Sequence, residues 1–206
     1  MMFHGIDISH WQGIIDFNQL KKTGVQFAII KAGGSDKSFY KDSKFETYYS
    51  SCKNLGIPVG AYYFVGACCV SAIDGEADAK RFLQIIKDKK FEYPIYIYIE
   101  TTQKNKKHGA TDAVIAFCET LENAGYYAGI YASDISGFHD ALQIERLNSY
   151  DKWVARYGKS PQYVKEYGMW QYSSKGKLNG INGNVDLDIA YLDYESIMKK
   201  NHLNGF

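Results

Sequence analysis

Two kinds of apolar pattern alternate along nearly the whole of this chain. Short runs rich in β-branched and aromatic residues, of the kind that forms buried strands, recur eight times. Between the early runs, apolar residues repeat every three or four positions, which is the spacing of one helix face. Strands that alternate with helices are typical of a parallel sheet covered by helices. The expected strands are residues 3–9, 25–33, 59–67, 93–100, 126–132, 152–157, 167–173 and 186–192.

The helical segments between these strands carry recognisable start and stop signals. Gly56 and Pro58 lie where the first helix should end, because both residues commonly follow a helix. Thr111 is the expected N-cap of the third helix, and Gly125 is the residue expected to end it. The three helical segments are residues 45–55, 79–86 and 114–121.

Eight strands favour closure of the sheet into a (β/α)8-type barrel, which is an α/β fold. The later connections are too short for full helices, so the outer helices of the C-terminal half should be short or missing. An open flavodoxin-like sheet is the main alternative. The 206 residues are 46% hydrophobic and show no linker or internal repeat. We therefore expect one domain, residues 1–206, built around one core.

Charge, hydropathy and cysteine spacing exclude several functional classes. Lys+Arg (24) nearly balance Asp+Glu (23) without a long basic run, so no nucleic-acid partner is expected. No apolar run approaches the about 18 residues that span a bilayer, so no membrane-spanning helix is expected. The four cysteines lack CxxC spacing, and the chain has neither an HExxH motif nor a Gly-rich phosphate loop. We therefore expect no metal site and no cofactor.

Acidic side chains lie at the ends of predicted strands, where β/α barrels carry their active sites. Asp7 closes the first strand and Glu100 closes the fourth. Asp186 and Asp188 lie at the start of the last strand, so their height in the barrel is open. A carboxylate among apolar residues costs energy to bury unless it is paired or its pKa shifts. These residues are the candidate acids, with a hydrogen bond to a neighbouring loop as the alternative role for each.

Strand geometry adds a prediction for the segment YPIYIYIE. Side chains alternate along a strand, so Tyr96, Tyr98 and Glu100 share one face, and residues 95, 97 and 99 share the other. The isoleucines should pack under the helices, and the tyrosines should face the barrel interior. Positions 98 and 100 are about 6 to 7 Å apart along a strand. That separation suits two groups on either side of a scissile bond, although only Glu100 is a carboxylate.

Eight segments, spread over almost the whole chain, together resemble the family 25 glycoside hydrolases. These are lysozymes of the Chalaropsis type, found in phage endolysins and bacterial autolysins. Each segment alone is weak, but their order and spacing are specific. The resemblance implies a β/α barrel with incomplete outer helices. The segments are GIDISHWQG (5–13), AIIKAGGSDKSFYKD (28–42), LGIPVGAYYF (55–64), YPIYIYIETT (93–102), GIYAS (129–133), WVARYG (153–158), MWQYSSKGKLNGINGNVDLD (169–188) and VDLDIAYLD (185–193).

The resemblance also implies roles for individual residues. Glu100 takes the position of the general acid/base, which protonates the leaving glycosidic oxygen and then activates water. Asp7 and Asp186 match two further acidic positions, which shape the electrostatics of the site and orient the sugar's 2-acetamido group or the catalytic pair. Four residues fall where the family lines its groove, with a core role as the alternative for each: Lys31, Tyr62, Tyr131 and Trp170.

Tyr98 departs from the Asp-x-Glu pattern of the family. A phenol has a reference pKa of about 10 and supplies no negative charge at neutral pH. Three accounts are open: Tyr98 acts as a nucleophile, Asp7 or Asp186 takes over the electrostatic role, or the chain binds glycan without cleaving it. Tyr63 is a second departure, because the family often carries His at this position, and a neutral ring replaces a protonatable one.

The expected function is that of a muramidase. Such an enzyme hydrolyses the β-1,4 bond between N-acetylmuramic acid and N-acetylglucosamine in peptidoglycan, here with activity weakened by Tyr98. The alternatives are a non-catalytic glycan-binding relative and an unrelated β/α-barrel enzyme acting on another sugar. The expected partner is the glycan strand of bacterial peptidoglycan, bound by a monomer outside the cell at the wall. The first residues show no secretory signal, which fits either phage-type release or a segment of a longer secreted protein.

Overall fold

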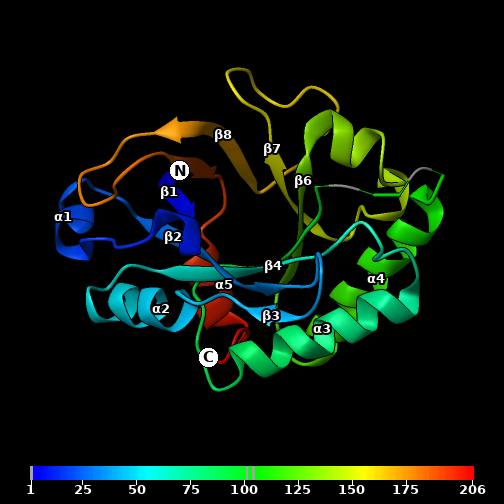
Figure 1. Cartoon of the computed structure of the whole chain (residues 1–206), viewed down its shortest axis with the longest axis horizontal. Helices are drawn as coiled ribbons and strands as arrows, with labels where there is room; N and C mark the ends of the chain where they lie inside the picture. Colours follow the sequence, from blue (N-terminus) through cyan, green and yellow to red (C-terminus); the bar gives the residue numbers. More distant parts are fainter. Residues whose placement is uncertain (1, 101, 104) are drawn as a thin grey trace.

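A computed structural model describes residues 2–100, 102–103 and 105–206. Figure 1 shows a barrel of strands with helices packed around part of its outer surface. The barrel strands are β1 (Phe3–Ile8), β2 (Phe27–Gly34), β4 (Val59–Phe64), β5 (Ile95–Tyr98), β6 (Ala128–Ser133), β7 (Asp151–Ala155), β8 (Met169–Gly176) and β9 (Val185–Ala190). They neighbour one another in the order β1, β9, β8, β7, β6, β5, β4, β2, and pairing of β1 with β2 closes the ring. The predicted barrel is confirmed, and the open sheet is wrong.

The last barrel strand runs in the opposite direction to its neighbours, so the prediction of a parallel sheet is wrong for this strand. β9 runs antiparallel to both β8 and β1, while the other barrel pairs are parallel. The connection through residues 177–184 is too short for a parallel crossover, which needs about a dozen residues. A small strand, β3 (Tyr40–Lys41), pairs with the end of β2 as an addition to the barrel. The start of β9 therefore lies at the same end of the barrel as the carboxyl ends of the parallel strands.

The three predicted helices are confirmed as α2 (Phe45–Asn54), α3 (Ala72–Ile86) and α4 (Lys107–Asn123). α3 begins before its periodic residues, because the Ser71 side chain accepts a hydrogen bond from the backbone N–H of Asp74. Thr111 is not the N-cap of α4: it lies inside the helix, and its hydroxyl donates to the carbonyl of Lys107. Gly125 follows the end of α4 with a φ of 82°, as a helix-terminating glycine does.

The outer layer thins along the chain, as the sequence predicted. A π-helical turn η2 (Asp134–His139) and a short 3-10 turn η3 (Ile144–Arg146) are the elements between β6 and β7. Residues 156–168, all of them described, connect β7 to β8 without a helix. Short helices α1 (Phe17–Lys22) and α5 (Tyr194–Lys200) complete the fold. No helix in the described part of the chain is both long enough and apolar enough to cross a membrane.

The apolar core has two layers, separated by the barrel wall. Ile95, Ile97 and Ile99 belong to the outer cluster, between the strands and the helices. Tyr96 and Tyr98 belong to the inner cluster, inside the barrel. The predicted alternation is therefore confirmed for residues 95–99, whereas the strand ends at Tyr98 and Glu100 lies in a bend just beyond it. It follows that a side chain on the inner face of a strand end reaches the mouth of the barrel.

Candidate active site

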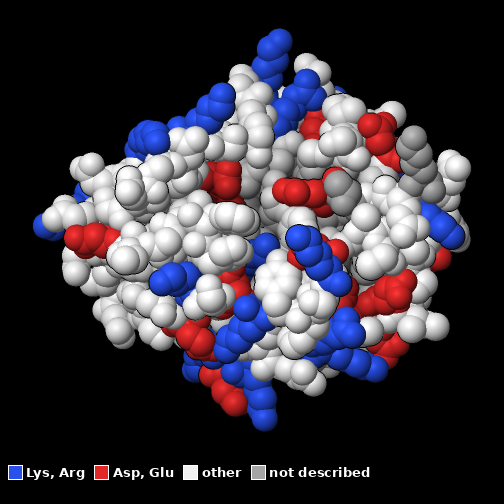
Figure 2. All heavy atoms as spheres, viewed as in Figure 1, with Lys and Arg blue, Asp and Glu red and all other residues white. Residues whose placement is uncertain are grey.

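A cavity of about 660 Å³ opens at the end of the barrel where the parallel strands finish. Asp7 on β1, Glu100 just after β5 and Asp186 on β9 all contribute to its wall. Asp7 and Asp186 are register partners in the antiparallel β1–β9 pair, so their side chains share one face of the sheet. Figure 2 shows two groups of acidic side chains near the centre of one face, between basic side chains above and below. The fold thus brings the three predicted acids to one cavity.

Burial disfavours the ionised form of the inner acids. Asp7 is 4% exposed and accepts a hydrogen bond of 2.7 Å from the Gln171 side chain. Its pKa is raised well above the usual range by burial, and the carboxylates of Asp188 and Asp186 raise it further. Asp188 is fully buried, accepts from the Trp153 indole at 2.8 Å, and also has its pKa raised by burial. These neighbouring buried carboxyls will not all be ionised together.

Asp186 is the more accessible of these acids. Burial and the nearby Glu100 carboxylate raise its pKa to about 6. At pH 7 it is therefore mostly ionised, and it faces the cavity. Glu100 itself is exposed, and its Oε1 accepts a hydrogen bond of 2.9 Å from the Tyr98 hydroxyl. The cavity wall therefore carries one accessible carboxyl just beyond β5 and one negative charge at the start of β9.

Tyr98 is a buried phenol rather than an accessible one. Its ring stacks on Tyr131 with a centroid separation of 3.7 Å and on Tyr62 at 4.8 Å. Burial raises the pKa of Tyr98 far above its usual value, and the neighbouring Tyr131 and Tyr62 act in the same direction. A phenolate nucleophile is therefore strongly disfavoured here, and the side chain acts as a hydrogen-bond donor.

Lys31 on β2 lies in the cavity wall as expected. The side chain is 7% exposed, and its ammonium lies 4.6 Å from the Phe64 ring centroid and 5.4 Å from that of Tyr40. Burial lowers the pKa of Lys31, while the carboxylates of Asp42, Asp36 and Glu100 act in the opposite direction. A cation held against two rings at this depth suits an acidic or strongly polar group of a ligand.

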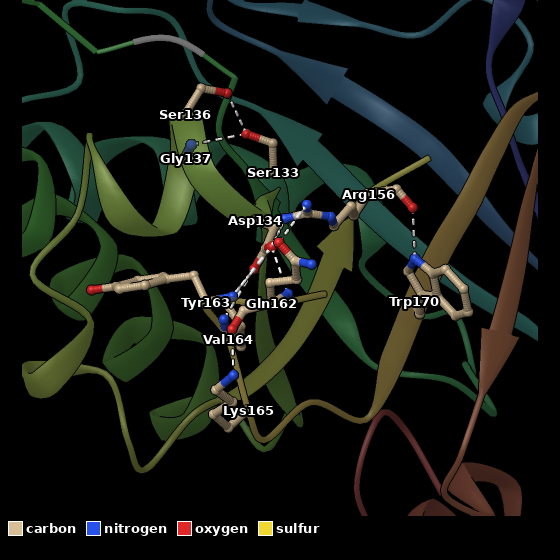
Figure 3. Close-up of polar contacts among 10 residues, drawn as sticks. All are labelled: Ser133, Asp134, Ser136, Gly137, Arg156, Gln162, Tyr163, Val164, Lys165 and Trp170. Atoms are coloured by element: carbon tan, nitrogen blue, oxygen red, sulfur yellow. Dashed lines mark hydrogen bonds and ion pairs between the residues drawn. The ribbon is translucent and has the colours of Figure 1, made fainter. Parts of the chain in front are cut away.

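The other predicted groove residues divide into those at the cavity and those away from it. Tyr62 on β4 lines the cavity. Tyr131 on β6 lies beneath Tyr98 inside the barrel, 3% exposed, and is not part of the lining. Trp170 occupies the opposite face of β8 from Gln171, and its indole donates to the Arg156 carbonyl at 2.8 Å (Figure 3). Neither Tyr131 nor Trp170 is in position to stack on a ligand in this cavity.

Figure 3 shows what holds the segment beside Trp170. The Asp134 carboxylate accepts from the Arg156 guanidinium at 2.6 Å and from the backbone N–H groups of Gln162, Tyr163 and Val164. Burial raises the pKa of Asp134, but these hydrogen bonds outweigh it and hold the pKa below its usual range. One carboxylate therefore fixes the helix-free connection between β7 and β8.

Tyr63, the second departure from the family pattern, lies outside the site. Because it is adjacent to Tyr62 on β4, its side chain points to the other face of the strand. There it is fully buried against Phe82 of α3 and Phe117 of α4, and its hydroxyl donates to Asp78 at 3.3 Å. Its lack of an imidazole does not alter the cavity.

Trp11 is a candidate binding residue that sequence reasoning missed. It is 79% exposed and lines the cavity from a short 3-10 turn, η1 (His10–Gln12). Ser9 and Gln12 form a reciprocal capping box that fixes this turn, with the Ser9 side chain accepting from the Trp11 N–H. The motif ISHWQG contained the signal, since an apolar ring just after a strand-end acid is placed to meet a ligand.

Gln171 is the second residue missed, and its signal is weaker. The sequence places it in a strand without indicating which face it occupies. Its amide joins Asp7 to two phenols, the buried Tyr131 at 2.8 Å and the more exposed Tyr157 at 3.0 Å. Within the described residues, no group of three or more His, Cys, Asp or Glu side chains is arranged to hold a metal ion.

Comparisons with known proteins show the family of this chain. The family model described as glycosyl hydrolases family 25 matches residues 6–181. The autolytic lysozyme of Clostridium acetobutylicum is 32% identical over 185 residues, which cover 89% of this chain and 54% of that protein. Lysozyme M1 of Streptomyces globisporus is 29% identical over 202 residues, covering 88% of this chain and 65% of that protein. The chain thus spans between half and two thirds of the length of these relatives.

A solved structure supports the fold over nearly the full length of both chains. A family 25 glycosyl hydrolase from Bacillus anthracis superposes with a TM-score of 0.82 at 24% identity, covering 98% of this chain and 93% of that chain. Because the family model matches most of the sequence, the chain belongs to glycosyl hydrolase family 25.

Proposed function

We propose that this protein is a peptidoglycan muramidase that cleaves the β-1,4 bond between N-acetylmuramic acid and N-acetylglucosamine. The observation that carries the proposal is the meeting of Glu100, Asp7 and Asp186 at one cavity. The relatives named as lysozymes give the substrate class. The protein would act as a monomer on the glycan strands of the bacterial wall.

In this proposal Glu100 is the general acid/base. It is the exposed carboxyl of the three, so it can reach a glycosidic oxygen in the cavity. It protonates the leaving oxygen, and the resulting carboxylate then takes a proton from the attacking water. The Tyr98 hydroxyl donates a hydrogen bond to the Glu100 carboxylate and holds this side chain in position.

The charge that the family obtains from an aspartate at position 98 has to come from elsewhere. Asp186 is the best candidate, because it is partly accessible, lines the cavity and is mostly ionised at neutral pH. It would stabilise the positive charge that develops on the sugar ring or on the acetamido group. Asp7, more deeply buried, would orient the site through Gln171.

Binding of the sugar is assigned to the remaining lining residues. Trp11 offers an exposed apolar ring, which suits stacking on the apolar face of a pyranose. Tyr62 and Lys31 also line the cavity, and Lys31 offers a positive charge. These residues add aromatic and cationic groups to the cavity that holds the acids.

The experiment is release of reducing ends from purified peptidoglycan by the unmodified protein, Glu100→Gln and Tyr98→Asp. Activity in the unmodified protein that Glu100→Gln abolishes supports the proposal. The structure also gives a reason to keep a second candidate, a glycan-binding protein without catalysis, because Tyr98 is a buried neutral group. That candidate is favoured if only Tyr98→Asp cleaves peptidoglycan while the unmodified protein still binds it.

A further inference from the structure

A continuous set of side-chain hydrogen bonds joins Glu100 to Asp7 through the barrel interior. The Tyr98 hydroxyl lies 2.9 Å from Glu100 Oε1 and 3.2 Å from the Tyr131 hydroxyl. Tyr131 lies 2.8 Å from Gln171 Oε1, and Gln171 Nε2 lies 2.7 Å from Asp7 Oδ2. The exposed Glu100 and the buried Asp7 are therefore linked by three intervening side chains.

Donor and acceptor chemistry fixes the direction of these bonds from the Asp7 end. Gln171 Nε2 donates to Asp7 Oδ2, which leaves the Gln171 amide oxygen to accept. The Gln171 amide therefore presents its NH2 group to Asp7 and its oxygen to the phenols of Tyr131 and Tyr157. Tyr131 uses its single proton on that oxygen, and its own oxygen remains able to accept. Tyr98 consequently has one proton and two acceptors.

The ionisation of Glu100 decides between those acceptors. A hydrogen bond to a charged carboxylate is stronger than one to a neutral hydroxyl, so an ionised Glu100 takes the Tyr98 proton. A protonated Glu100 is a weaker acceptor, and the Tyr131 oxygen then competes for the same proton. We propose that Tyr98 is a positioning residue whose hydroxyl holds the ionised Glu100 side chain and turns to Tyr131 when Glu100 becomes protonated.

The packing restricts this change to rotation of one O–H bond. The Tyr98 ring is held between Tyr131, at an interplanar angle of 11°, and Tyr62, at 28°. The side chain is 9% exposed, so water has little access to compete for the proton. Burial raises the pKa of Tyr98, which keeps the phenol protonated and able to donate throughout the range in which carboxyls titrate. Neither ring has to move for the acceptor to change.

The other charged groups around Glu100 set the background for the switch. The titratable groups that share the active-site cavity with Glu100 include Lys31 on β2, Asp7 on β1, Asp186 on β9, His10, Asp36 and Lys37. Lys107 on α4 and Asp140 share a second pocket with it. Tyr62 on β4, Tyr131 on β6 and Tyr157 after β7 are neutral, since burial raises the pKa of each. None of the tyrosine variants below changes a formal charge, so this background is the same in all three.

The test is a pH titration of the Glu100 side-chain carboxyl carbon by NMR in protein labelled with ¹³C-glutamate. The Glu100 signal is identified as the one missing from Glu100→Gln. Tyr98→Phe removes the donor and should raise the titration midpoint by about one pH unit. Tyr131→Phe removes the competing acceptor and should lower the midpoint. Tyr96→Phe is the matched control, because Tyr96 is also a buried phenol on the inner face of β5, and its hydroxyl has no partner among the described residues.

An unchanged midpoint in Tyr98→Phe overturns the proposal, as does an equal shift in Tyr98→Phe and Tyr96→Phe. An unchanged or higher midpoint in Tyr131→Phe overturns the switching step. The inference builds on Glu100 as the proposed acid/base, but the titration does not require turnover. Absence of peptidoglycan cleavage together with the expected shifts would remove the proposed muramidase activity and leave the hydrogen-bond switch in place.

Discussion

Asp7 and Asp186 face each other as register partners on the antiparallel strands β1 and β9. Because β9 reverses, the beginning of this strand lies beside the end of β1, and both carboxyls reach the mouth of the barrel. Two acids that are far apart in the sequence thereby share one cavity with Glu100. Their different burial gives them different pKa shifts, which is the basis of the first prediction.

Asp186→Asn should lower peptidoglycan hydrolysis by about 100-fold at pH 7, the size of effect seen when one preorganised electrostatic group is removed. Since the pKa of Asp186 is about 6, activity of the unmodified protein should fall as the pH drops through 6, and the variant should lack that step. Glu76→Gln, which removes an exposed carboxylate on α3, is the control for loss of charge. A variant with full activity at pH 7 would contradict the assigned role.

The same substitution should stabilise the fold. A carboxyl whose pKa is raised on folding lowers stability once the pH is above its unfolded value, because the folded state disfavours the charge. The neutral amide removes that cost, so the free energy of unfolding at pH 7 should rise by about 1 kcal/mol. Urea unfolding at pH 7 and pH 4 measures this, and the gain should shrink at the lower pH. A loss of stability at pH 7 would argue against the raised pKa.

Trp11 should report ligand binding through its fluorescence. It is the exposed tryptophan at the cavity, whereas Trp153 is buried in the barrel and Trp170 lies on the outer face of β8. Soluble glycan fragments of peptidoglycan should change the emission of the unmodified protein and of Trp170→Phe, but not of Trp11→Phe. Trp11→Ala should also weaken binding about tenfold, which corresponds to about 1.4 kcal/mol of lost stacking. A signal retained in Trp11→Phe would place the ligand elsewhere.

Asp134→Asn should destabilise the protein by about 2 to 3 kcal/mol, because the carboxylate accepts from one guanidinium and three backbone N–H groups. The pKa of Asp134 is lowered on folding, so its contribution is complete above the unfolded pKa and is lost as the pH falls through the folded one. Thermal unfolding at pH 7 measures the difference. Asp140→Asn, which changes an exposed carboxylate paired with His139, should alter stability by less than about 0.5 kcal/mol.

Tyr63→Phe should leave hydrolysis within about twofold of the unmodified protein and cost at most about 1 kcal/mol of stability, the value of one neutral hydrogen bond. The hydroxyl contacts Asp78 on the helix side of β4 and does not reach the cavity. Parallel assays of Tyr63→Phe and Tyr98→Phe on peptidoglycan provide the measurement. A large loss of activity in Tyr63→Phe would show that the family departure at this position matters after all.

The alternation of side chains along β5 could be read from the sequence, because isoleucines and tyrosines strictly alternate there and the period of a strand is two. The same regularity placed Asp7 and Glu100 at strand ends. The sequence of β8 does not show which of Trp170 and Gln171 faces the barrel interior. Their orientation is set by the pairing of β8 with β7 and β9 in the closed barrel.

The sequence by itself determined the order of strands and helices, the barrel class and two of the three acids at the cavity, since these follow from local periodicity and from strand ends. Tertiary structure decided the rest. The reversal of β9 brought Asp186 to the barrel mouth. Tyr131, which was expected to line the groove, is covered by the ring of Tyr98 stacked on it. The capped turn after β1 exposed Trp11. These outcomes depend on contacts between segments distant in the chain, and their geometry is set only when the sheet closes.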